Sequence, residues 1–444
     1  MPGAWPATET ALRLRASWVA GALAVFGLAL LVRVLWAVYA EADPTDGRFD
    51  DSVFYHQAAR ALADGRGYVS PWTGEDTALF PPGYPFFLAG LYAVFGADPQ
   101  VGESANVLLG AATCGLAFAL GRLLFGWRAG LAAGLILAFF PGQALFVPTL
   151  MSEGLFAFLL VGALLLAVLA VRRAGRGRLL LAAATGLVAG LAALVRGEGL
   201  FIPLMIVPFW ALAWADRRAA LKAGALVAAG MLALVLPWSV RNYLVMDSPI
   251  LLSSNIGGNF LMGRYAGTME RVAAVDELMA PYRGLSFKEQ EVKMNSAGWR
   301  EGLELALTKP WREVQVAGPK VKALYDRDDD FLLHGEGFAS GRRFDEPLRS
   351  ALQWTANSYY FVVLGLAGLG AAAAWSRNRP AAVLLVWTVL LWTLNETLMI
   401  ADSRYHLPLM PVIIILAAAG VVGVGEVVRL VKVAVWRETS AQVG

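Results

Sequence analysis

Two adjacent carboxylates, Asp50 and Asp51, follow the first hydrophobic segment within the sequence Arg-Phe-Asp-Asp-Ser-Val-Phe-Tyr-His, residues 48–56. A carboxylate within hydrogen-bond reach of a substrate hydroxyl can remove its proton as a general base. Tyr55 and His56 follow closely and can contact a polar substrate. The alternative is that the two acids are solvated loop residues and that Tyr55 and His56 anchor the segment at a membrane surface.

Further ionisable side chains lie at the ends of later hydrophobic segments. They are Glu153, Arg196, Glu198, Arg241 and Arg404. Charges at membrane depth are costly and usually serve a function or pair with one another. Arginine presents a planar fork of donors that fits a phosphate. The alternatives are that Arg196 and Glu198 simply pair with each other, and that Arg241 and Arg404 extend to lipid headgroups.

The composition indicates an integral membrane protein of the helical type. Of its 444 residues, 58% are hydrophobic and only 16% are charged, whereas a soluble domain is about half apolar and a quarter charged. The sequence has no Walker loop, HExxH, CxxC pair or GxSxG motif, which argues against the soluble enzymes that carry them. The three histidines, His56, His334 and His406, are far apart, and Cys114 is the only cysteine. These counts argue against a His-rich metal site and exclude an intrachain disulfide.

Ten stretches predict membrane-spanning helices, each of which needs about 20 mostly apolar residues. They are residues 17–39, 101–125, 129–147, 154–171, 179–195, 199–215, 223–244, 354–374, 381–399 and 407–431. Residues 84–95 are apolar but short, and predict a helix that lies in or dips into the outer interface. Arg13 and Arg15 precede the first stretch, which we expect to be a retained signal anchor.

The orientation follows from lysine and arginine in the short connections, because these residues stay on the cytoplasmic side. They occupy alternate connections, at 122–128, 172–178, 217–222 and 377–379, and also both ends of the chain, with Arg13, Arg15, Arg429, Lys432 and Arg437. Both termini are therefore predicted to be cytoplasmic. All the candidate charges then fall on the external face.

Three parts are expected along the chain. Residues 1–244 form a membrane module with a first external loop over 40–100, residues 245–350 form an external cap, and residues 351–444 form the last membrane helices. Within the first loop, residues 52–64 predict an amphipathic helix resting on the membrane, and the loop has few residues that could build a core. In the cap, the capping box Ser286-Phe287-Lys288-Glu289 starts a helix that Lys309-Pro310 ends, and a second helix covers 314–325.

This order of features resembles the GT-C glycosyltransferases that use polyprenyl-phosphate sugars, among them the protein O-mannosyltransferases and the bacterial lipid A aminoarabinose transferases. The resemblance rests on the acid pair with its Tyr-His, on Leu-Ala-Asp-Gly-Arg-Gly-Tyr at 62–68, on Pro-Pro-Gly-Tyr-Pro at 81–85, on Pro-Trp-Ser-Val-Arg-Asn-Tyr at 237–243, on Asn-Ile-Gly-Gly-Asn-Phe at 255–260, and on Arg404-Tyr405. It spans most of the chain. The family's commoner acid pair is Asp-Glu. Alignment on the Tyr-His favours Asp51 as the catalytic acid, alignment on the pair favours Asp50, and we take Asp51.

The resemblance implies an all-α polytopic membrane protein, in effect a mannosyltransferase-like enzyme of the bacterial plasma membrane. It would transfer a hexosyl or pentosyl group, with inversion, from a polyprenyl-phosphate donor to a hydroxyl of a glycolipid, polysaccharide or protein on the external face. No nucleic acid partner is implied. No cofactor is expected, although a divalent metal between Asp51 and the phosphate stays an alternative.

The same resemblance implies a role for each candidate residue. Asp51 or Asp50 would be the general base, and Glu153 would orient the acceptor or one of the arginines. The donor phosphate would bind to Arg196, Arg241 and Arg404. Substrate contacts are expected from Tyr55, His56, Tyr84 and Glu198.

Two other classes of protein compete with this interpretation. A transporter or flippase of lipid-linked precursors would also hold charges inside a helical bundle, and a non-catalytic scaffold could bind a partner through its external cap. Transporters usually show inverted repeats and helices broken near mid-membrane. The charges here cluster at one face and a large external segment follows, which favours the enzyme.

Overall fold

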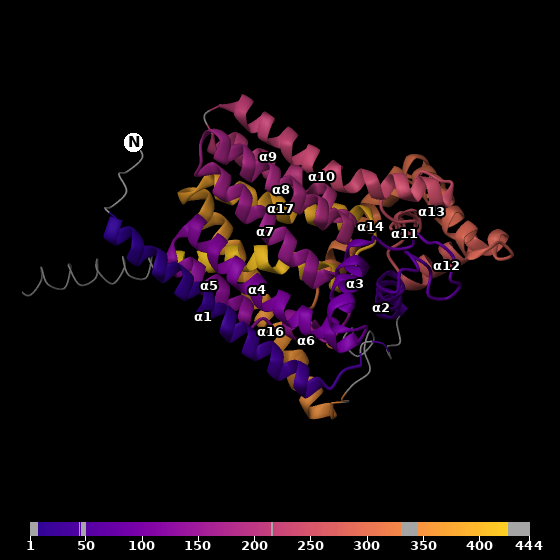
Figure 1. Ribbon diagram of the computed structural model, residues 1–444, viewed down its shortest axis with the longest axis horizontal. Coiled ribbons are helices and arrows are strands. Elements are labelled where there is room, and N and C mark those ends of the chain that lie inside the picture. The colour runs from indigo at the N-terminus through magenta and orange to yellow at the C-terminus, as the bar shows by residue number, and fades with distance from the viewer. Residues whose placement is uncertain are drawn as a thin grey trace, which may run out of the picture.

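The structure, a computed structural model, describes residues 8–43, 45, 50–214, 216–329, 332, 342 and 344–424, and for residues 8–17 and 50 it describes the backbone alone. His334 and the C-terminal cations Arg429, Lys432 and Arg437 lie outside the described residues. Within the described part of the chain every regular element is a helix, most of them long and side by side (Figure 1).

Eight helical segments of the described chain are long and apolar enough to cross a bilayer. They are α1 (Thr8–Ala40, apolar from Trp18), α4 (Pro99–Phe125), α7 (Glu153–Val171), α8 (Gly175–Val195), α10 (Arg217–Met246), α16 (Glu346–Arg377), α17 (Arg379–Leu398) and the last span, Ser403–Val424, which opens with the 3₁₀ helix η3 (Ser403–Leu409). A multi-pass membrane protein is therefore confirmed.

The two other predicted spans consist of shorter pieces. Residues 129–147 form α5 (Trp127–Ala138) and α6 (Pro141–Phe146), and residues 199–215 form η1 (Gly197–Phe201) and α9 (Ile202–Ala213). Pro141 lacks an amide hydrogen and starts a new helix, so the last carbonyls of α5 need other partners. Buried Arg33 of α1 supplies them, with Nη1 donating to the Ala138 carbonyl (3.3 Å) and Nη2 to the Leu137 carbonyl (3.4 Å).

The core of the membrane bundle lies around the last span. Ser403–Val424 is the most buried of the eight spans, and α1 is the least. A span that is apolar all round suits this central position. It packs tightly against α16, because a Cβ on Gly370 would collide with the carbonyl of Leu416, and one on Gly420 with the carbonyl of Leu366. Small residues allow such close backbone approach between helices in lipid.

The remaining helices gather at one end of the bundle, on the right in Figure 1. They are α2 (Asp50–Ala63), α3 (Gly83–Phe95), α11 (Asn255–Met262), α12 (Thr268–Met279), η2 (Ala280–Tyr282), α13 (Phe287–Thr308) and α14 (Pro310–Tyr325). The capping box of Ser286 and Glu289 starts α13, and Lys309 ends it, as predicted. The helices α11 and α12 were not predicted.

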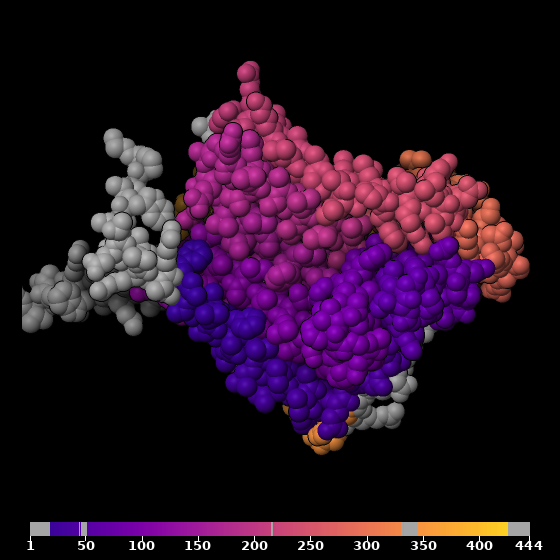
Figure 2. Space-filling model, in the orientation of Figure 1, coloured from indigo at the N-terminus to yellow at the C-terminus, as the bar shows by residue number. Residues whose placement is uncertain are grey.

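Residues 50–100 lie beside the cap, and the loop after α2 packs against α13. Figure 2 shows this violet segment beside the coral residues of the cap. Phe54 and Ala58 of α2 are completely buried and belong to the main core, so the expectation of few core residues in this loop was wrong. Glu291 of α13 clamps the two segments together, accepting hydrogen bonds from the Ala78 amide (3.0 Å) and the Ser254 hydroxyl (2.9 Å).

The basic connections gather at the opposite end of the bundle. There Arg172 donates to the carbonyl of Leu123 (2.8 Å), Asn378 donates to the carbonyl of Leu124 (3.1 Å), and Arg178 lies over the ring of Trp214. The ends of separate spans thus meet in one basic layer, far along the helices from the cap.

Candidate active site

A cavity of about 480 Å³ lies at the cap end, where α2, the α8–η1 turn, α11, the end of α17 and η3 meet. One wall is apolar and includes Leu200, Phe201, Ile256, Met262 and Ile400. The polar side chains of the lining are Asp51, Tyr55, Ser152, Arg196, Glu198, Ser253, Asn255, Asn259, Asn395, Glu396, Arg404 and Tyr405. A mixed lining of this kind suits a ligand with one polar and one apolar part.

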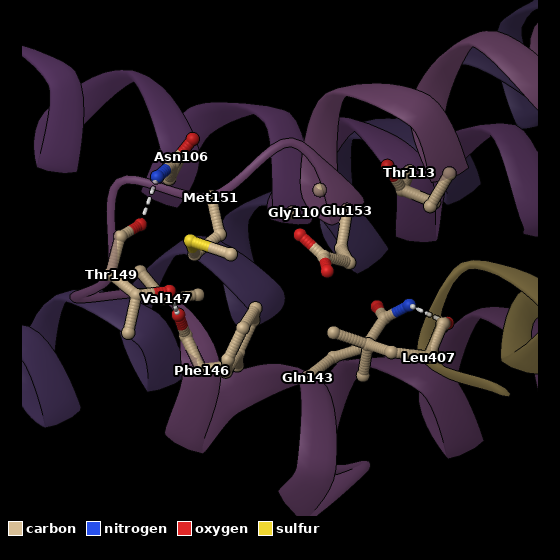
Figure 3. Close-up of a pocket in the computed structure, with 12 residues that line it drawn as sticks. Asn106, Gly110, Thr113, Gln143, Phe146, Val147, Thr149, Met151, Glu153 and Leu407 are labelled. Atoms are coloured by element: carbon tan, nitrogen blue, oxygen red, sulfur yellow. Dashed lines mark hydrogen bonds between the residues drawn. The ribbon is translucent and has the colours of Figure 1, made fainter. Parts of the chain in front are cut away.

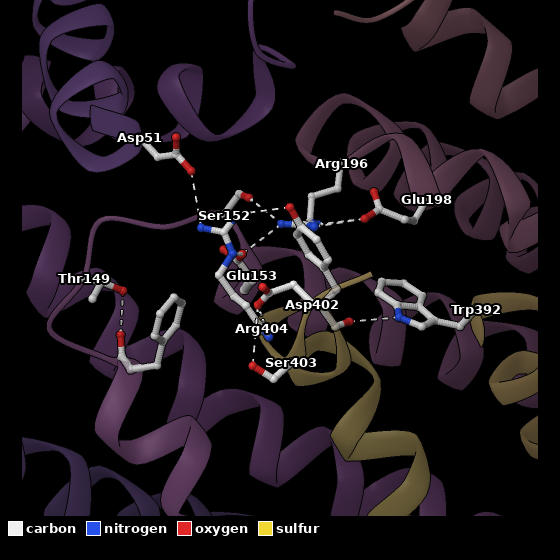
Figure 4. A network of polar contacts seen from close by, with 12 residues as sticks. Asp51, Thr149, Ser152, Glu153, Arg196, Glu198, Trp392, Asp402, Ser403 and Arg404 are labelled. Carbon is white, nitrogen blue, oxygen red and sulfur yellow. Dashed lines mark hydrogen bonds and ion pairs between the residues drawn. The ribbon is translucent and has the colours of Figure 1, made fainter. Parts of the chain in front are cut away.

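Arg404 links two distant parts of the chain across this cavity. It lies in η3, whose first turn is capped by Asp402, with the Arg404 amide donating to Oδ1 of Asp402 (3.1 Å). Its Nη1 lies 3.3 Å from Oδ2 of Asp51, and its Nε lies 3.3 Å from Oε1 of Glu153. One guanidinium therefore holds the first acid of the cavity and a carboxylate from α7 (Figure 4).

Arg196 occupies the extended residue between α8 and η1. Its Nη1 lies 3.0 Å from Oε1 of Glu153 and donates to the Ser152 hydroxyl (3.3 Å), and its Nη2 lies 3.0 Å from Oε1 of Glu198. Burial by itself lowers the pKa of Arg196, but the carboxylates of Glu198 and Glu153 outweigh it and raise the pKa above its ordinary value. Arg196 is therefore a permanent cation.

Glu153 is the common partner of both arginines, as Figure 4 shows. Its side chain is completely buried, below the floor of the cavity, and it opens α7. A buried carboxylate is costly unless it is paired, and the N-terminal turn of a helix favours negative charge. Two guanidinium groups and the helix start together satisfy this requirement.

A second, much smaller cavity lies on the other side of Glu153. It measures about 30 Å³, and its polar lining comes from Asn106, Thr113, Gln143 and Thr149 (Figure 3). This space is large enough for a water molecule. Glu153 thus separates the large cavity from a small polar one.

The α8–η1 turn that carries Arg196 depends on close backbone contacts. A Cβ on Gly199 would collide with the backbone of Ala192 and Ala193, and one on Gly83, at the start of α3, would collide with the backbone of Leu194 and Val195. Glycine at both positions lets the turn fold back on α8 and lets α3 pack against it.

The backbone before Arg404 is held by basic side chains of the cap. Buried Lys320 of α14 donates to the carbonyls of Gly263 (2.8 Å), Met399 (2.8 Å) and Thr397. Arg271 of α12 donates to the Ala401 carbonyl (3.1 Å). The connection between α17 and η3 is therefore fixed by the cap.

Several predicted site residues are brought together here. Asp51, Tyr55, Arg196, Glu198 and Arg404 line the cavity. Burial, with Asp51 nearby, raises the pKa of Tyr55, so its hydroxyl is available as a donor. Asp50 is the first residue of α2, and its side chain lies outside what the structure describes.

Three predicted residues lie elsewhere. Arg241 donates to the carbonyls of Thr77 (2.6 Å) and Tyr68 (3.1 Å), so it holds the loop after α2 instead of facing the cavity. His56 lies on another face of α2, where Nδ1 and the Tyr92 hydroxyl are 2.8 Å apart, and burial lowers the pKa of its imidazole. Tyr84 is buried and hydrogen-bonded to Asn106. In each case the side chain is hydrogen-bonded to neighbouring residues outside the cavity.

The sequence interpretation missed Glu396. It lies on α17, is 3% exposed and lines the cavity, with the Asn395 amide donating to it (3.2 Å). A glutamate inside the apolar stretch 381–399 was a detectable signal, because ionisable residues within spans usually serve a function. Among the described residues, no group of three or more His, Cys, Asp or Glu is placed to hold a metal ion.

Comparison with known proteins places this site in a family context. A family model described as dolichyl-phosphate-mannose-protein mannosyltransferase matches residues 80–240. No curated protein sequence matches the chain. The matched residues include the α8–η1 turn with Arg196 and the start of α7 with Glu153.

Solved structures extend the likeness over most of the chain. One similar structure is AglB, the oligosaccharyltransferase of Archaeoglobus fulgidus, in complex with an inhibitory peptide and a dolichol-phosphate. Its TM-score with this chain is 0.55 at 16% sequence identity, and the match covers 93% of this chain and 51% of AglB. The apo form of AglB has a TM-score of 0.57 at 16% sequence identity, and the match covers 95% of this chain and 52% of AglB. The predicted GT-C fold is confirmed. The chain spans about half the length of AglB. ArnT of Cupriavidus metallidurans, bound to undecaprenyl phosphate, has a TM-score of 0.42 at 17% sequence identity, and the match covers 92% of this chain and 78% of ArnT.

Proposed function

We propose that the chain is a membrane glycosyltransferase that uses a polyprenyl-phosphate sugar. The observation that carries this proposal is the linked group Asp51–Arg404–Glu153–Arg196 at a cavity with one apolar wall. Such a site offers a carboxylate base and two cations within a short distance of each other. The protein mannosyltransferase match over 80–240 and the dolichol-phosphate in the AglB complex support the choice of donor.

In the proposed reaction the acceptor hydroxyl attacks the anomeric carbon of the donor sugar. Asp51 takes the hydroxyl proton as the new bond from oxygen to carbon forms, and the bond from carbon to the phosphate oxygen breaks. The electron pair of that bond leaves with the polyprenyl phosphate. Attack on the side opposite the leaving group inverts the anomeric centre, with no covalent sugar–enzyme intermediate.

The two arginines would stabilise the departing phosphate. Arg404 and Arg196 both line the cavity, and a guanidinium binds phosphate oxygens through two parallel donors. Glu153 contacts both guanidinium groups and would set their separation and direction. We propose it as a positioning residue, because it lies below the cavity floor.

Arg404 also contacts the proposed base. The 3.3 Å contact with Asp51 places one cation between the base and the site of the leaving group. A phosphate that binds to Arg404 would compete for this guanidinium. Donor binding would therefore loosen the Asp51 carboxylate and turn it toward an incoming acceptor.

The remaining lining supports a sugar and a lipid chain. Tyr55, Glu198, Asn255 and Asn259 can hydrogen-bond sugar hydroxyls. The apolar wall formed by η1, α11 and the connection after α17 gives the start of a polyprenyl chain a dry surface. The acceptor would be a hydroxyl of a protein, a glycolipid or a polysaccharide.

We place the site on the external face of a bacterial plasma membrane. The basic connections at the opposite end of the bundle support this placement, because such residues stay cytoplasmic. The proposed division of the chain follows the same logic. Residues 1–244 supply the base and Arg196, residues 245–350 cover the site, and residues 351–444 supply Arg404.

The test is a transfer assay with purified protein in liposomes. Polyprenyl-phosphate sugars and a simple hydroxyl acceptor are supplied, and release of polyprenyl phosphate is measured together with glycosylated acceptor. Both products are expected, in equal amounts. Movement of the donor across the bilayer without bond cleavage would indicate a flippase and contradict the proposal, as would the absence of both activities.

A further inference from the structure

A second large cavity, separate from the one described above, lies between α1 and α4. It measures about 650 Å³ and lies on the side of the bundle where α1 runs along the lower edge of the molecule (Figure 2). Val34, Val38 and Leu108 line it and are 41%, 71% and 52% exposed, so this surface faces the hydrocarbon of a bilayer. We call it the α1–α4 groove.

The groove contains one buried acid. Glu103 of α4 lines it and is only 6% exposed. Among the described residues, no hydrogen bond or ion pair reaches this side chain. Glu41, at the mouth of the groove, is already paired with Arg342 at 2.7 Å. Glu103 is therefore a carboxylate without a partner, aimed into a space that opens to lipid.

The depth of Glu103 matches the level of a lipid headgroup. It lies four residues after the start of α4 at Pro99, or about 6 Å along the helix axis. The apolar lining along α1 runs from Val38 to Leu30, about 12 Å along the helix axis. One leaflet of the hydrocarbon core is about 15 Å thick. The groove thus has the length of one acyl chain, with an acid at its polar end.

We propose that the α1–α4 groove binds a bilayer lipid with a primary ammonium headgroup, of the ethanolamine phospholipid class. The ammonium donates to the Glu103 carboxylate, which then acquires the cation that a buried acid requires. An acyl chain lies between Val34 and Leu108. Headgroups that carry only a phosphate are repelled by Glu103, which separates this site from the two-arginine cavity.

A choline headgroup gives the sharpest comparison within one lipid family. It carries the same positive charge but has no N–H group, so it cannot donate to a carboxylate. Tighter binding of the ethanolamine lipid than of the choline lipid would therefore measure the hydrogen bond to Glu103. Tighter binding of either lipid than of the glycerol lipid would measure the effect of the positive charge. A charge-assisted hydrogen bond corresponds to a difference of about tenfold or more in affinity.

The experiment is native mass spectrometry of the full chain in detergent, titrated with phosphatidylethanolamine, phosphatidylcholine and phosphatidylglycerol of identical acyl chains. The parent should retain the ethanolamine lipid about tenfold better than the glycerol lipid. Glu103→Gln should abolish this preference, whereas Glu270→Gln, a change of an exposed acid on α12, should leave it intact. Ala37→Trp, which fills the groove from α1 and keeps Glu103, should reduce binding of all three lipids at this site.

Thermal unfolding of each variant controls for loss of fold. Equal retention of all three lipids by the parent, or an unchanged preference in Glu103→Gln, would overturn the proposal. Preferred retention of the glycerol lipid, or of undecaprenyl phosphate added as a fourth probe, would also overturn it. None of these outcomes depends on sugar transfer.

Discussion

Replacing Asp51 by asparagine is the most direct test of the proposed base. The side chain keeps its shape and can still contact Arg404, but it can no longer accept a proton. General-base catalysis contributes about 10²–10⁴-fold to a rate, and each tenfold corresponds to about 1.4 kcal/mol of activation free energy. Turnover of Asp51→Asn should therefore fall by about 10²–10⁴-fold.

The structure predicts a much smaller effect on stability. The Asp51 side chain is 30% exposed and its contact with Arg404 is 3.3 Å long. A partly exposed pair of this kind contributes about 1 kcal/mol or less to the free energy of unfolding. Arg404 also keeps its contact with Glu153 in the variant. A loss of catalysis that greatly exceeds the loss of stability is the expected signature.

A matched control lies in the same chain. Asp76 pairs with Arg241 at the same distance of 3.3 Å, but neither residue lines the cavity. Asp76→Asn should leave turnover within about threefold of the parent. Transfer rate, donor affinity and thermal unfolding are measured for both variants in liposomes.

The outcomes separate three mechanisms. Transfer by Asp51→Asn within a few-fold of the parent would refute the assignment of the base. Equal losses of turnover in Asp51→Asn and Asp76→Asn would show that both act through folding of the first loop. Loss of transfer in Asp50→Asn alone would move the base by one residue and leave the mechanism unchanged.

Three further predictions concern the phosphate, the cap and the orientation. Arg404→Lys should weaken donor binding about tenfold or more, because lysine lacks the planar fork of arginine. Arg241→Lys, which lies away from the cavity, should not weaken it, and equal donor binding by the two variants would contradict the assignment of the phosphate site. Burial, with help from nearby cap arginines, lowers the pKa of Lys320 to about 7, whereas an unfolded lysine keeps its proton to about pH 10.4. Between these two pH values the chain takes up a proton when it unfolds, so the free energy of unfolding of the parent should rise from pH 7 to pH 10. Thermal unfolding measured across this pH range should show the rise in the parent and no rise in Lys320→Met. In a variant without the native cysteine, an impermeant thiol reagent added to intact cells should label Ser296→Cys in the cap but not Ser376→Cys at the basic end; the reverse pattern would place the cavity in the cytoplasm.

The membrane architecture was largely predictable from sequence, because it follows from local composition. Apolar length identified the eight segments that are long enough to cross a bilayer, but it also predicted two spans that the structure divides into shorter helices. The capping box located the start of α13 to the residue. The interruption of two spans was less evident. Residues 129–147 are almost entirely apolar, and the carbonyls of Leu137 and Ala138 before the break at Pro141 accept from Arg33, about a hundred residues earlier.

The site was partly predictable, and its limits have a physical reason. Arg241 and Arg404 occupy the same kind of position in the sequence, an arginine at a predicted outer end of a span. They differ in their contacts with residues that are distant in sequence. Arg241 donates to the carbonyls of Tyr68 and Thr77, whereas Arg404 contacts the carboxylates of Asp51 and Glu153. Hydropathy and charge place a residue at a depth in the membrane. They do not specify which neighbour it faces.

The arrangement around Arg404 suggests why the cap follows the seventh predicted span and precedes the last three. Arg404 comes from the C-terminal part of the chain, whereas the acids that it contacts come from α2 and α7. Lipid-embedded helices can shift against one another, because hydrocarbon does not drive them together. The cap donates to carbonyls at residues 397–401 through Lys320 and Arg271, and Glu291 fixes the same cap to the loop after α2. Both sides of the Asp51–Arg404 contact are thereby tied to the same cap. A contact of 3.3 Å between segments some 350 residues apart needs such a tie, so substitutions in the cap should alter catalysis without touching the cavity.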